Sequence, residues 1–406
     1  MNKELLNSRV EFLYGFGVRV DNEESGNYPV FGSNGIIGFI NNFKVKGPGV
    51  IVGRKGSVGK VTFSKENFTP SDTAYYLSIK NPETDDLLFW YYYLKMLGLE
   101  KLNTHSSVPG LSRELAYLIN INVPDLISQQ KIAGVLSALD SKIELNNRIN
   151  AELEAMAKTI YDYWFVQFDF PHPFTKVITN KNGRRTELVE VKPYKSSGGK
   201  MVYNPQLKRE IPAGWEVGKI NDFCKTASGG TPLSTQKEYY DNGDIPWINS
   251  GELNNPYIIN TSNFITKEGL ANSSAKLFSP NTILIALYGA TAGKVSLLHI
   301  EACTNQAVCA VIPNSTLAVY YLKFSLEKIY NYLINLSSGS ARDNLSQDMI
   351  NELTFLIPTD KLLSKFNEIV KPCVASLIHN LKQNEQLTQL RDWLLPMLMN
   401  GQVKVK

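Results

Sequence analysis

Two glycine-rich loops, each with a lysine at the same place, are the segments of this chain that most suggest chemistry. They are GRKGSVGKV (53–61) and YGATAGKV (288–295). Such loops can hold the phosphates of a nucleotide, but the P-loop pattern GxxxxGK[ST] needs an earlier glycine and a hydroxyl residue after the lysine. In the first loop those two positions hold Arg54 and Val61, and the second loop fails in the same way. An ATPase is therefore the weakest interpretation of these loops.

Other catalytic patterns are missing from the sequence. It contains no NPPY or DPPY motif, so methyl transfer by this chain is not expected. The one nuclease-like fragment, TDK (359–361), follows a proline and better fits the start of a helix. The four histidines are scattered, and none forms HExxH or pairs with a cysteine at metal-ligand spacing. We expect a chain without a catalytic site, cofactor or metal of its own.

The remaining chemistry lies in polar, Gly-rich loops. Asn, Gln, Arg, Lys and Ser read base edges, while Gly and Ser suit a close approach to phosphates. A single loop of this kind is more typical of a plain turn, so only the joint pattern of the loops indicates DNA contact. The candidate DNA-contacting residues are Asn34, Arg54, Lys55, Ser57, Lys60, Ser71, Asp72, His105, Ser106, Ser107, Arg113, Ser228, Thr231, Asn249, Ser250, Tyr288, Thr291, Lys294, Asn305, Gln306, Ser338, Ser340, Arg342 and Asn344.

These loops must be positioned by larger elements, and the clearest is a long helix predicted over 126–165. Its other faces are polar, and the range contains no proline. At about 1.5 Å per residue it would reach roughly 60 Å, too long for the core of a small domain. A partner stripe occurs near the C-terminus. The first stripe is Ile132, Leu136, Leu139, Ile143, Ile149, Leu153, Met156 and Ile160; the second is Phe366, Val370, Leu377, Leu381, Leu387, Leu390 and Leu394.

The two halves of the chain repeat each other. GKV at 59–61 matches GKV at 293–295, and Pro124 matches Pro358, both at an offset of 234. Earlier the offset is 217 (Pro29 with Pro246), so the second copy carries about 17 extra residues. A constant offset over about 100 residues indicates a tandem duplication of an α/β globule followed by a long helix.

The two copies share a scaffold but differ in their polar side chains. Lys60 and Lys294 occupy equivalent places, whereas Ser71 and Asp72 face Asn305 and Gln306 in the alignment. Two recognition modules for different sequences would need this combination.

One segment breaks the symmetry. IPAGWEVGKI (211–220) has no counterpart before Met1. Three explanations stay open: the first domain lacks that strand, another segment replaces it, or the chain start is incomplete.

Composition is that of an ordinary protein with room for two cores: 406 residues, 43% hydrophobic, 20% charged and a net charge of +4. The four cysteines show no CxxC spacing, and no apolar run suggests a signal peptide or a membrane span, so a cytoplasmic location is expected. We predict a target domain over 1–125, the helix over 126–165, a basic linker over 166–210, a second domain over 211–358 and a C-terminal helix over 359–406. The linker could be merely solvated, or a strap near phosphates or an acidic subunit.

With these features in place, the chain resembles the specificity (S) subunit of type I restriction–modification systems. The motifs that carry the resemblance cover most of the chain: IPAGW (211–215), SGGTP (228–232), YGATAGKV (288–295), TNQAV (304–308), NLS (344–346) and the paired Pro124 and Pro358 with their long helices.

The resemblance implies both a fold and a set of partners. In that family two α/β (α+β) target recognition domains, in tandem duplication, each read one half of a split site in double-stranded DNA. Two long antiparallel helices form a coiled-coil spacer and dock two methyltransferase (M) subunits, which can recruit two restriction (R) subunits. The alternative is a coiled-coil scaffold whose α/β domains bind protein rather than DNA.

Overall fold

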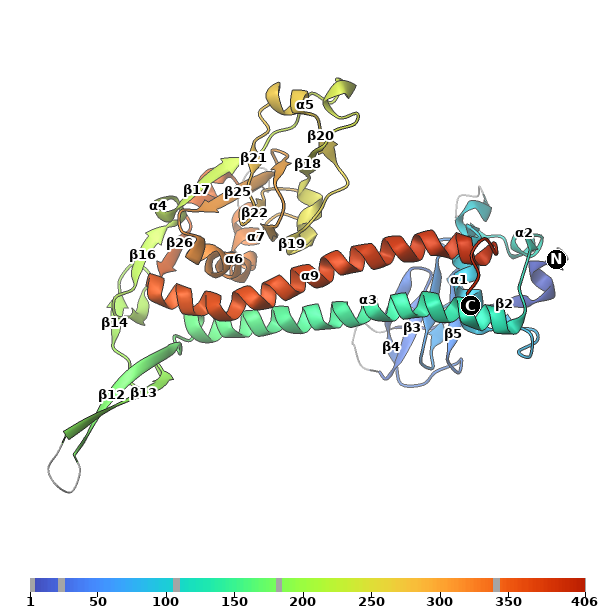
Figure 1. Ribbon diagram of the computed structural model, residues 1–406, viewed down its shortest axis with the longest axis horizontal. Helices are drawn as coiled ribbons and strands as arrows, with labels where there is room; N and C mark the ends of the chain where they lie inside the picture. The colour runs from blue at the N-terminus through green and yellow to red at the C-terminus, as the bar shows by residue number, and fades with distance from the viewer. Residues whose placement is uncertain (1–3, 21–25, 105–109, 180–184, 339–343, 406) are drawn as a thin grey trace. The chain divides into compact units, whose positions relative to one another are not determined.

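The computed structural model describes residues 4–20, 26–104, 110–179, 185–338 and 344–405. It divides into two compact units: unit 1 comprises Met1–Leu145 with Asn384–Lys406, and unit 2 comprises Asn146–Gln383. The division falls inside the two long helices, α3 (Leu126–Tyr161) and α9 (Asp360–Met399), so each helix contributes to both units (Figure 1).

Unit 1 builds one sheet of four strands and one of three around an aromatic helix. The strand orders are β2-β8-β5-β6 and β4-β3-β7. Its elements before α3 are β1 (Glu4–Leu5), a 3-10 turn (Leu6–Ser8), β2 (Val10–Tyr14), β3 (Tyr28–Gly32), β4 (Gly35–Ile40), β5 (Gly49–Gly53), β6 (Val61–Ser64), β7 (Thr69–Pro70), β8 (Ala74–Ile79), α1 (Leu87–Met96), a 3-10 turn (Leu99–Leu102), β9 (Asn103–Thr104), β10 (Gly110–Leu111), α2 (Arg113–Tyr117) and β11 (Asn120–Ile121).

Unit 2 repeats this plan with additions. Its sheets have the orders β17-β25-β22-β23-β19 and β20-β18-β24-β21. Its elements are β16 (Glu216–Lys219), α4 (Ile220–Phe223), β17 (Cys224–Ser228), a 3-10 turn (Lys237–Tyr239), β18 (Ile245–Ile248), a 3-10 helix (Ser250–Asn254), β19 (Tyr257–Ile258), β20 (Phe264–Ile265), α5 (Lys267–Ala271), β21 (Leu277–Phe278), β22 (Ile283–Ala286), β23 (Val295–Leu298), β24 (Ala302–Thr304), β25 (Val308–Pro313), a 3-10 turn (Thr316–Ala318), α6 (Val319–Lys328), α7 (Tyr330–Ser338), α8 (Gln347–Asn351) and β26 (Thr354–Ile357).

The strand registers confirm the duplication. Val10 pairs with Ile79 in unit 1 as Cys224 pairs with Pro313 in unit 2, and the second members of these pairs are 234 residues apart. The parallel pairs β3·β7 and β18·β24 match in the same way. The expected offset of 217 holds there, because Val30 pairs with Thr69 as Trp247 pairs with Cys303.

Unit 1 has a shortened counterpart of the opening strand of unit 2. β1 pairs antiparallel with β11, as β16 pairs with β26 in unit 2. The equivalence extends to the next residue, because the amide of Leu6 donates to the carbonyl of Ile119 and the amide of Ile220 donates to that of Leu353, both at 2.9 Å. The short β1 thus occupies in unit 1 the place that β16 occupies in unit 2.

The two long helices pair antiparallel. In unit 2 the Asn146 amide donates to Gln383 at 2.8 Å, while Asn150, one turn later in α3, accepts from Asn380, earlier in α9, at 2.9 Å. In unit 1, Arg391 forms an ion pair with Asp140 at 2.7 Å. Apolar residues of α3, such as Ile132 and Leu136, complete the core of unit 1 against the aromatic side chains of α1.

The segment between the helix and unit 2's first strand is more structured than the predicted linker. A π-helical turn (Asp162–Val166) ends α3, and two antiparallel hairpins follow it. The hairpins are formed by β12 (Pro171–Thr179) with β13 (Arg185–Pro193), and by β14 (Met201–Asn204) with β15 (Arg209–Pro212).

Candidate nucleic-acid interface

Five predicted residues gather beside one edge of unit 2. β18 and β24 are parallel neighbours, so the residues that follow them meet at the same edge of the sheet. Asn305 donates to the side-chain oxygen of Asn249 at 3.3 Å, and the hydroxyl of Thr231 is hydrogen-bonded to Gln306. Ser250 follows Asn249 directly. Exposed Thr231 and Gln306, with half-buried Asn249, Ser250 and Asn305, form a continuous amide and hydroxyl surface.

The backbone beneath this surface is fixed by glycines. A Cβ on Gly229 would lie 2.2 Å from the carbonyl oxygen of Thr304, and one on Gly230 would lie 2.3 Å from Ser274. Only glycine allows this approach, which brings the amide of Gly230 to 2.9 Å from the Thr304 carbonyl. The loop carrying Thr231 is therefore held in place before any ligand arrives.

The equivalent edge of unit 1 has the same backbone but different side chains. A Cβ on Gly15 would lie 1.9 Å from the carbonyl oxygen of Ser71, and Phe16 forms a parallel bridge with Ser71. The Ser71 side chain is only 4% exposed and is hydrogen-bonded to Thr73 at 2.7 Å, whereas Asp72 is exposed. Burial argues against Ser71 as a base reader and leaves Asp72 as the candidate there.

A second group in unit 1 joins Arg54 and Arg113 to aromatic rings. The guanidinium carbons lie 4.9 and 5.1 Å, respectively, from the ring centroid of Tyr14, which is 50% exposed. Arg54 also donates to the carbonyl of exposed Asp72 at 2.8 Å. Lys55, the next residue, is exposed and bridges to Gly110. Three predicted cations thus lie on one stretch of surface.

Unit 2 fills the equivalent place with neutral polar groups. Ser228 is hydrogen-bonded to Gln347 at 2.8 Å, Gln347 donates to Thr226 at 2.9 Å, and Thr226 is hydrogen-bonded to Asn351 at 2.7 Å. Arg113 and Gln347 are the first residues of α2 and α8 and stand 234 positions apart. The same site in the fold is therefore cationic in unit 1, whereas the described side chains of unit 2 are uncharged there.

The paired lysines of the GKV loops are held locally. Lys60 donates to the side-chain and backbone oxygens of Asn34 at 2.7 and 2.8 Å. Lys294 lies 4.8 Å from the ring centroid of Tyr330. Each lines a recess that also includes residues of α3, of about 640 Å³ for Lys60 and 320 Å³ for Lys294.

The other candidates of these loops are less accessible. Ser57 and Tyr288 are half-buried, and Thr291 is only 4% exposed, so its burial argues against DNA contact. His105, Ser106, Ser107, Ser340 and Arg342 lie outside the described residues. Ser338 is the last residue of α7, and Asn344 is half-buried beyond it. DNA contact by the accessible candidates stays a prediction.

Sequence reasoning missed the partners that shape these side chains. Tyr14, Thr226 and Gln347 were not among the candidates, because a tyrosine, a threonine and a glutamine in separate segments carry no motif. The repeat offset could have identified Gln347, since it aligns with Arg113.

The outer faces of the long helices carry a second feature. Met156 of α3 is 54% exposed and Leu390 of α9 is 44% exposed, although both belong to the predicted apolar stripes. They are repeat-related at the offset of 234. Each unit therefore presents an exposed apolar side chain at the same position of its helix.

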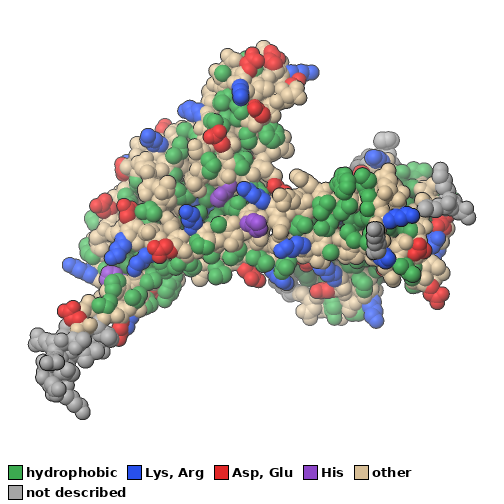
Figure 2. All heavy atoms as spheres, in the orientation of Figure 1, with side chains coloured by type: hydrophobic (Ala, Val, Ile, Leu, Met, Phe, Trp, Pro, Cys, Tyr) green, Lys and Arg blue, Asp and Glu red, His purple; other side chains and the backbone are tan. Residues whose placement is uncertain are grey.

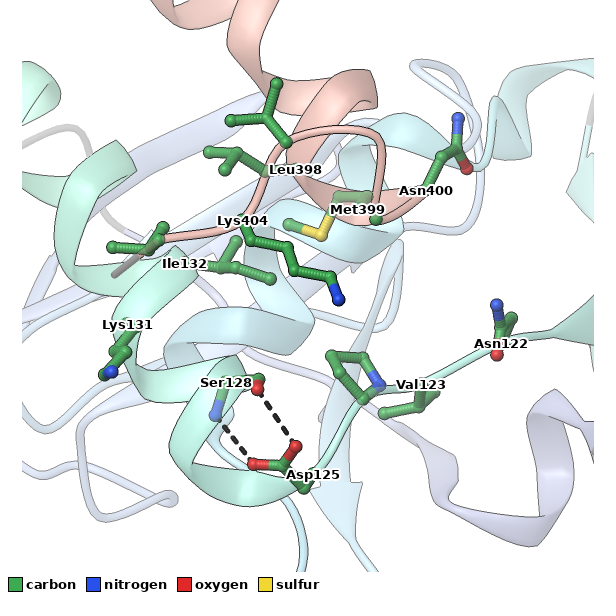
Figure 3. A pocket seen from close by; sticks show the side chains of 14 residues that line it. Asn122, Val123, Asp125, Ser128, Lys131, Ile132, Leu398, Met399, Asn400 and Lys404 are labelled. Carbon is green, nitrogen blue, oxygen red and sulfur yellow. Dashed lines mark hydrogen bonds between the residues drawn. The ribbon is translucent and has the colours of Figure 1, made fainter. Parts of the chain in front are cut away.

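The start of α3 borders a pocket of about 410 Å³ that both polar and apolar side chains line (Figure 3). Asp125 accepts from the amide and hydroxyl of Ser128 at 2.9 Å in the first turn, and Leu398 and Met399 of α9 form the opposite wall. The equivalent pocket at the start of α9 is about 210 Å³, because Trp215, Tyr194 and Phe170 line it.

Charge on the visible face is mixed: Figure 2 shows Lys and Arg side chains interspersed with Asp and Glu. Local clusters, rather than a single-sign field, must therefore carry any attraction for an anion. None of the described helices has the length and apolar character to cross a lipid bilayer.

Known proteins resemble this chain in sequence. A family model described as the type I restriction modification DNA specificity domain matches residues 18–155 and 212–389. The type I restriction enzyme HindI specificity subunit of Haemophilus influenzae is 27% identical over 345 residues, which cover 77% of this chain and 74% of that protein. The MjaIX specificity subunit of Methanocaldococcus jannaschii is 27% identical over 364 residues, with 88% and 78% covered.

A solved structure has the same fold. The crystal structure of a type I restriction–modification S subunit from M. genitalium superposes with a TM-score of 0.64 at 17% identity, covering 98% of this chain and 95% of that one.

Proposed function

The chain belongs to the type I restriction modification DNA specificity family, and from that premise we propose that it is the non-catalytic DNA-reading subunit of such a complex. Unit 1 reads one half of a split DNA site, and unit 2 reads the other. The relatives named above are specificity subunits of type I restriction enzymes, which favours DNA over protein as the ligand of the two units.

The observation that carries the proposal is the duplicated scaffold with divergent side chains. Equivalent backbone positions hold Asp72 and Gln306, and Arg113 and Gln347, in the two units. A shared backbone places both readers in the same way relative to DNA, and different side chains read different bases. A protein scaffold with two like partners would gain nothing from this divergence.

Partner docking follows from the same symmetry. Met156 and Leu390 give each unit one exposed apolar anchor at a repeat-related helix position. Two identical M subunits can therefore dock in the same way, one on each unit, and supply the chemistry that this chain lacks. R subunits would join through the M subunits.

The test exchanges the reading residues between the units. In N305S/Q306D the unit 2 edge receives the unit 1 residues, and in D72Q the unit 1 edge receives one from unit 2. We expect N305S/Q306D to change the bases of one half-site and D72Q to change the other, with discrimination shifts of about 1–3 kcal/mol per base pair. The readout is sequencing of methylated sites after assembly with the M subunit.

Three results would contradict the proposal. A single variant that changes both half-sites would end the assignment of one unit to one half. Methylation by the chain without an M subunit would contradict the non-catalytic role. A scaffold whose units bind protein would give an assembled complex without the steep salt dependence that phosphate contacts impose on duplex binding.

A further inference from the structure

We propose that Arg54 and Arg113 of unit 1 form, with Tyr14, a binding site for one phosphate of the DNA backbone, and that the described residues of unit 2 form no such site at the equivalent position. This inference rests on the proposed DNA-reading function and adds an asymmetry to it. The two units would differ in backbone affinity as well as in the bases that they read.

The two guanidinium groups contact the same tyrosine ring. Each lies about 5 Å from the same Tyr14 ring centroid, at 4.9 and 5.1 Å, so their carbons are at most 10.0 Å apart. Arg54 also lies 5.8 Å from the ring of Tyr75, and Arg113 lies 5.9 Å from that of Tyr117. Stacking on rings orients a guanidinium while its N–H edges stay available for an anion.

These two cations lack an anionic partner in the described part of unit 1. No described carboxylate lies within 4.0 Å of either guanidinium. Arg54 donates to a carbonyl, that of Asp72, and Arg113 donates to the carbonyl of Phe12 at a long 3.4 Å. The Nε of Arg113 is buried and has no hydrogen-bond partner there. A buried donor without a partner is costly, so the hydrogen bonding of Arg113 is incomplete in the described structure.

The surrounding phenols do not supply the missing charge. Burial raises the pKa of Tyr75 to about 12, even though the two arginines act in the opposite direction. The ring is therefore neutral at physiological pH. The described part of unit 1 therefore leaves both guanidinium groups without a compensating anion.

A phosphate fits this site better than a base edge does. Both arginines are only half-exposed and are held against the rings, so they project little from the surface. Base edges lie at the floor of a groove about 8.5 Å deep, whereas phosphates line its rim. Planar guanidinium groups also match the oxygens of a phosphate in pairs.

Unit 2 provides an internal comparison. Arg54 and Leu287 are equivalent, because their carbonyls accept from the amides of Leu111 and Leu345, each at 2.8 Å. Tyr14 and Ser228 both end the first strand of their sheet. With Gln347 in place of Arg113, the described side chains of the unit 2 group are uncharged and are hydrogen-bonded to one another.

The test converts the unit 1 site to its unit 2 equivalent in the full chain assembled with M subunits. The variants are R54L, R113Q and the double variant, and duplex affinity is measured between about 50 and 300 mM salt. We expect weaker binding to cognate and unrelated duplexes alike, and a slope of log K against log salt lower by about 1 in the double variant. R113K, which keeps the charge but not the planar fork, should retain most of the slope.

The control is K80Q, which removes an exposed lysine beyond the far end of β8 and should leave the slope unchanged. Thermal unfolding of each variant verifies that unit 1 stays folded. Weaker binding confined to the cognate duplex would mean a base contact and overturn the phosphate site, as would an unchanged slope. If the wild-type complex itself fails to bind DNA, the proposed function fails and the phosphate site falls with it.

Discussion

At the scale of single residues, the buried cation Lys323 illustrates how context decides the behaviour of a side chain. Its side chain is fully buried in unit 2. The ammonium is paired with Glu327 at 2.9 Å, hydrogen-bonded to Tyr257 at 3.2 Å and 4.3 Å from the Tyr257 ring centroid. An unpaired charge could not be buried in this way, so Glu327 and Lys323 depend on each other.

His299 lies beside this cluster and makes unit 2 sensitive to acid. Burial, reinforced by Lys382 and Lys323, lowers the pKa of His299 to about 4. In the unfolded chain the pKa is about 6.5, so below that pH the unfolded state binds a proton that the folded state does not. The free energy of unfolding therefore falls as the pH drops from about 6.5 to 4, by roughly 3 kcal/mol at most.

We expect His299→Leu to remove this part of the pH dependence, as measured by urea unfolding between pH 7.5 and 4. His379→Gln, which changes an exposed histidine of α9, is the matched control and should leave the pH dependence intact. An unchanged pH dependence in His299→Leu would show that other groups cause the acid sensitivity.

Residue type alone predicted which side chains are polar but not which of them reach the surface. Ser71 and Thr291 lie in the same predicted polar loops as Asp72 and Lys294, yet both are buried. The difference arises from long-range packing. Gly15, which belongs to another segment of the chain, packs against the backbone of Ser71. No local sequence pattern predicts that contact.

At the scale of elements, the seam between the long helices follows most of the predicted stripe but departs from it at single positions. The prediction placed Met156 in the seam, but Met156 is exposed and Ala157 is buried. Asn146 and Asn150 lie in the seam itself, 0% and 8% exposed. A hydrophobicity pattern does not select asparagines or a small alanine as seam residues, so it missed these three positions. These two asparagines interrupt the apolar seam, whereas Asn147 is exposed.

We expect these asparagines to fix the alignment of the helices at some cost in stability, as a buried polar pair in a helix seam can do. Asn146→Ala should lower the free energy of unfolding by about 1–3 kcal/mol, because Gln383 loses its donor. The double variant N146L/Q383L should recover most of that loss.

The measurement is chemical denaturation, and Asn147→Ala on the exposed face is the control, expected to stay within about 0.5 kcal/mol of wild type. A double variant as unstable as Asn146→Ala would contradict this account. If the two helices lose their fixed alignment, the methylated sites should show a mixture of spacer lengths.

The hairpins of the linker were not foreseen, and the reason is compositional. KNGRR and SSGGK read as solvated loop, since strand prediction depends on apolar alternation. β12 and β13 pair over nine residues each, with Val189 and Val191 59% and 65% exposed, so their stability depends on backbone pairing more than on a core.

At the scale of the whole molecule, the repeat was the most informative sequence feature. It predicted two like units, their long helices and the extra residues of unit 2, because duplication leaves a constant offset that needs no physical model. It could not reveal that a short β1 stands in for β16, since two residues are too few to align. Register and hydrogen bonds were needed for that equivalence.

The proposed spacer makes a prediction that concerns both helices together. Adding seven residues after Ile143 in α3, and seven between Gln383 and Arg391 in α9, lengthens the pair by about 10 Å and keeps the phase of the seam. We expect the unread gap between the half-sites to grow by roughly three base pairs, as read from methylated genomic sites.

Insertion in α3 alone should instead destabilise the chain, because the pairs Asn146–Gln383 and Asp140–Arg391 could not both form. A matched insertion that leaves the gap unchanged would remove the ruler role of the helices.

The pairing of β1 with β11, and of β16 with β26, has a consequence for inheritance. The α/β part of each unit begins and ends in one pair of hydrogen-bonded strands, so its two borders are neighbours. Between β3 and β5, unit 1 has only β4, whereas unit 2 fits β20, α5 and β21 among other elements between β18 and β22 without disturbing that ladder. Genetic exchange at the two borders would thus replace a complete reader in one event, and a lineage could acquire a new target sequence without altering the helices or their partners.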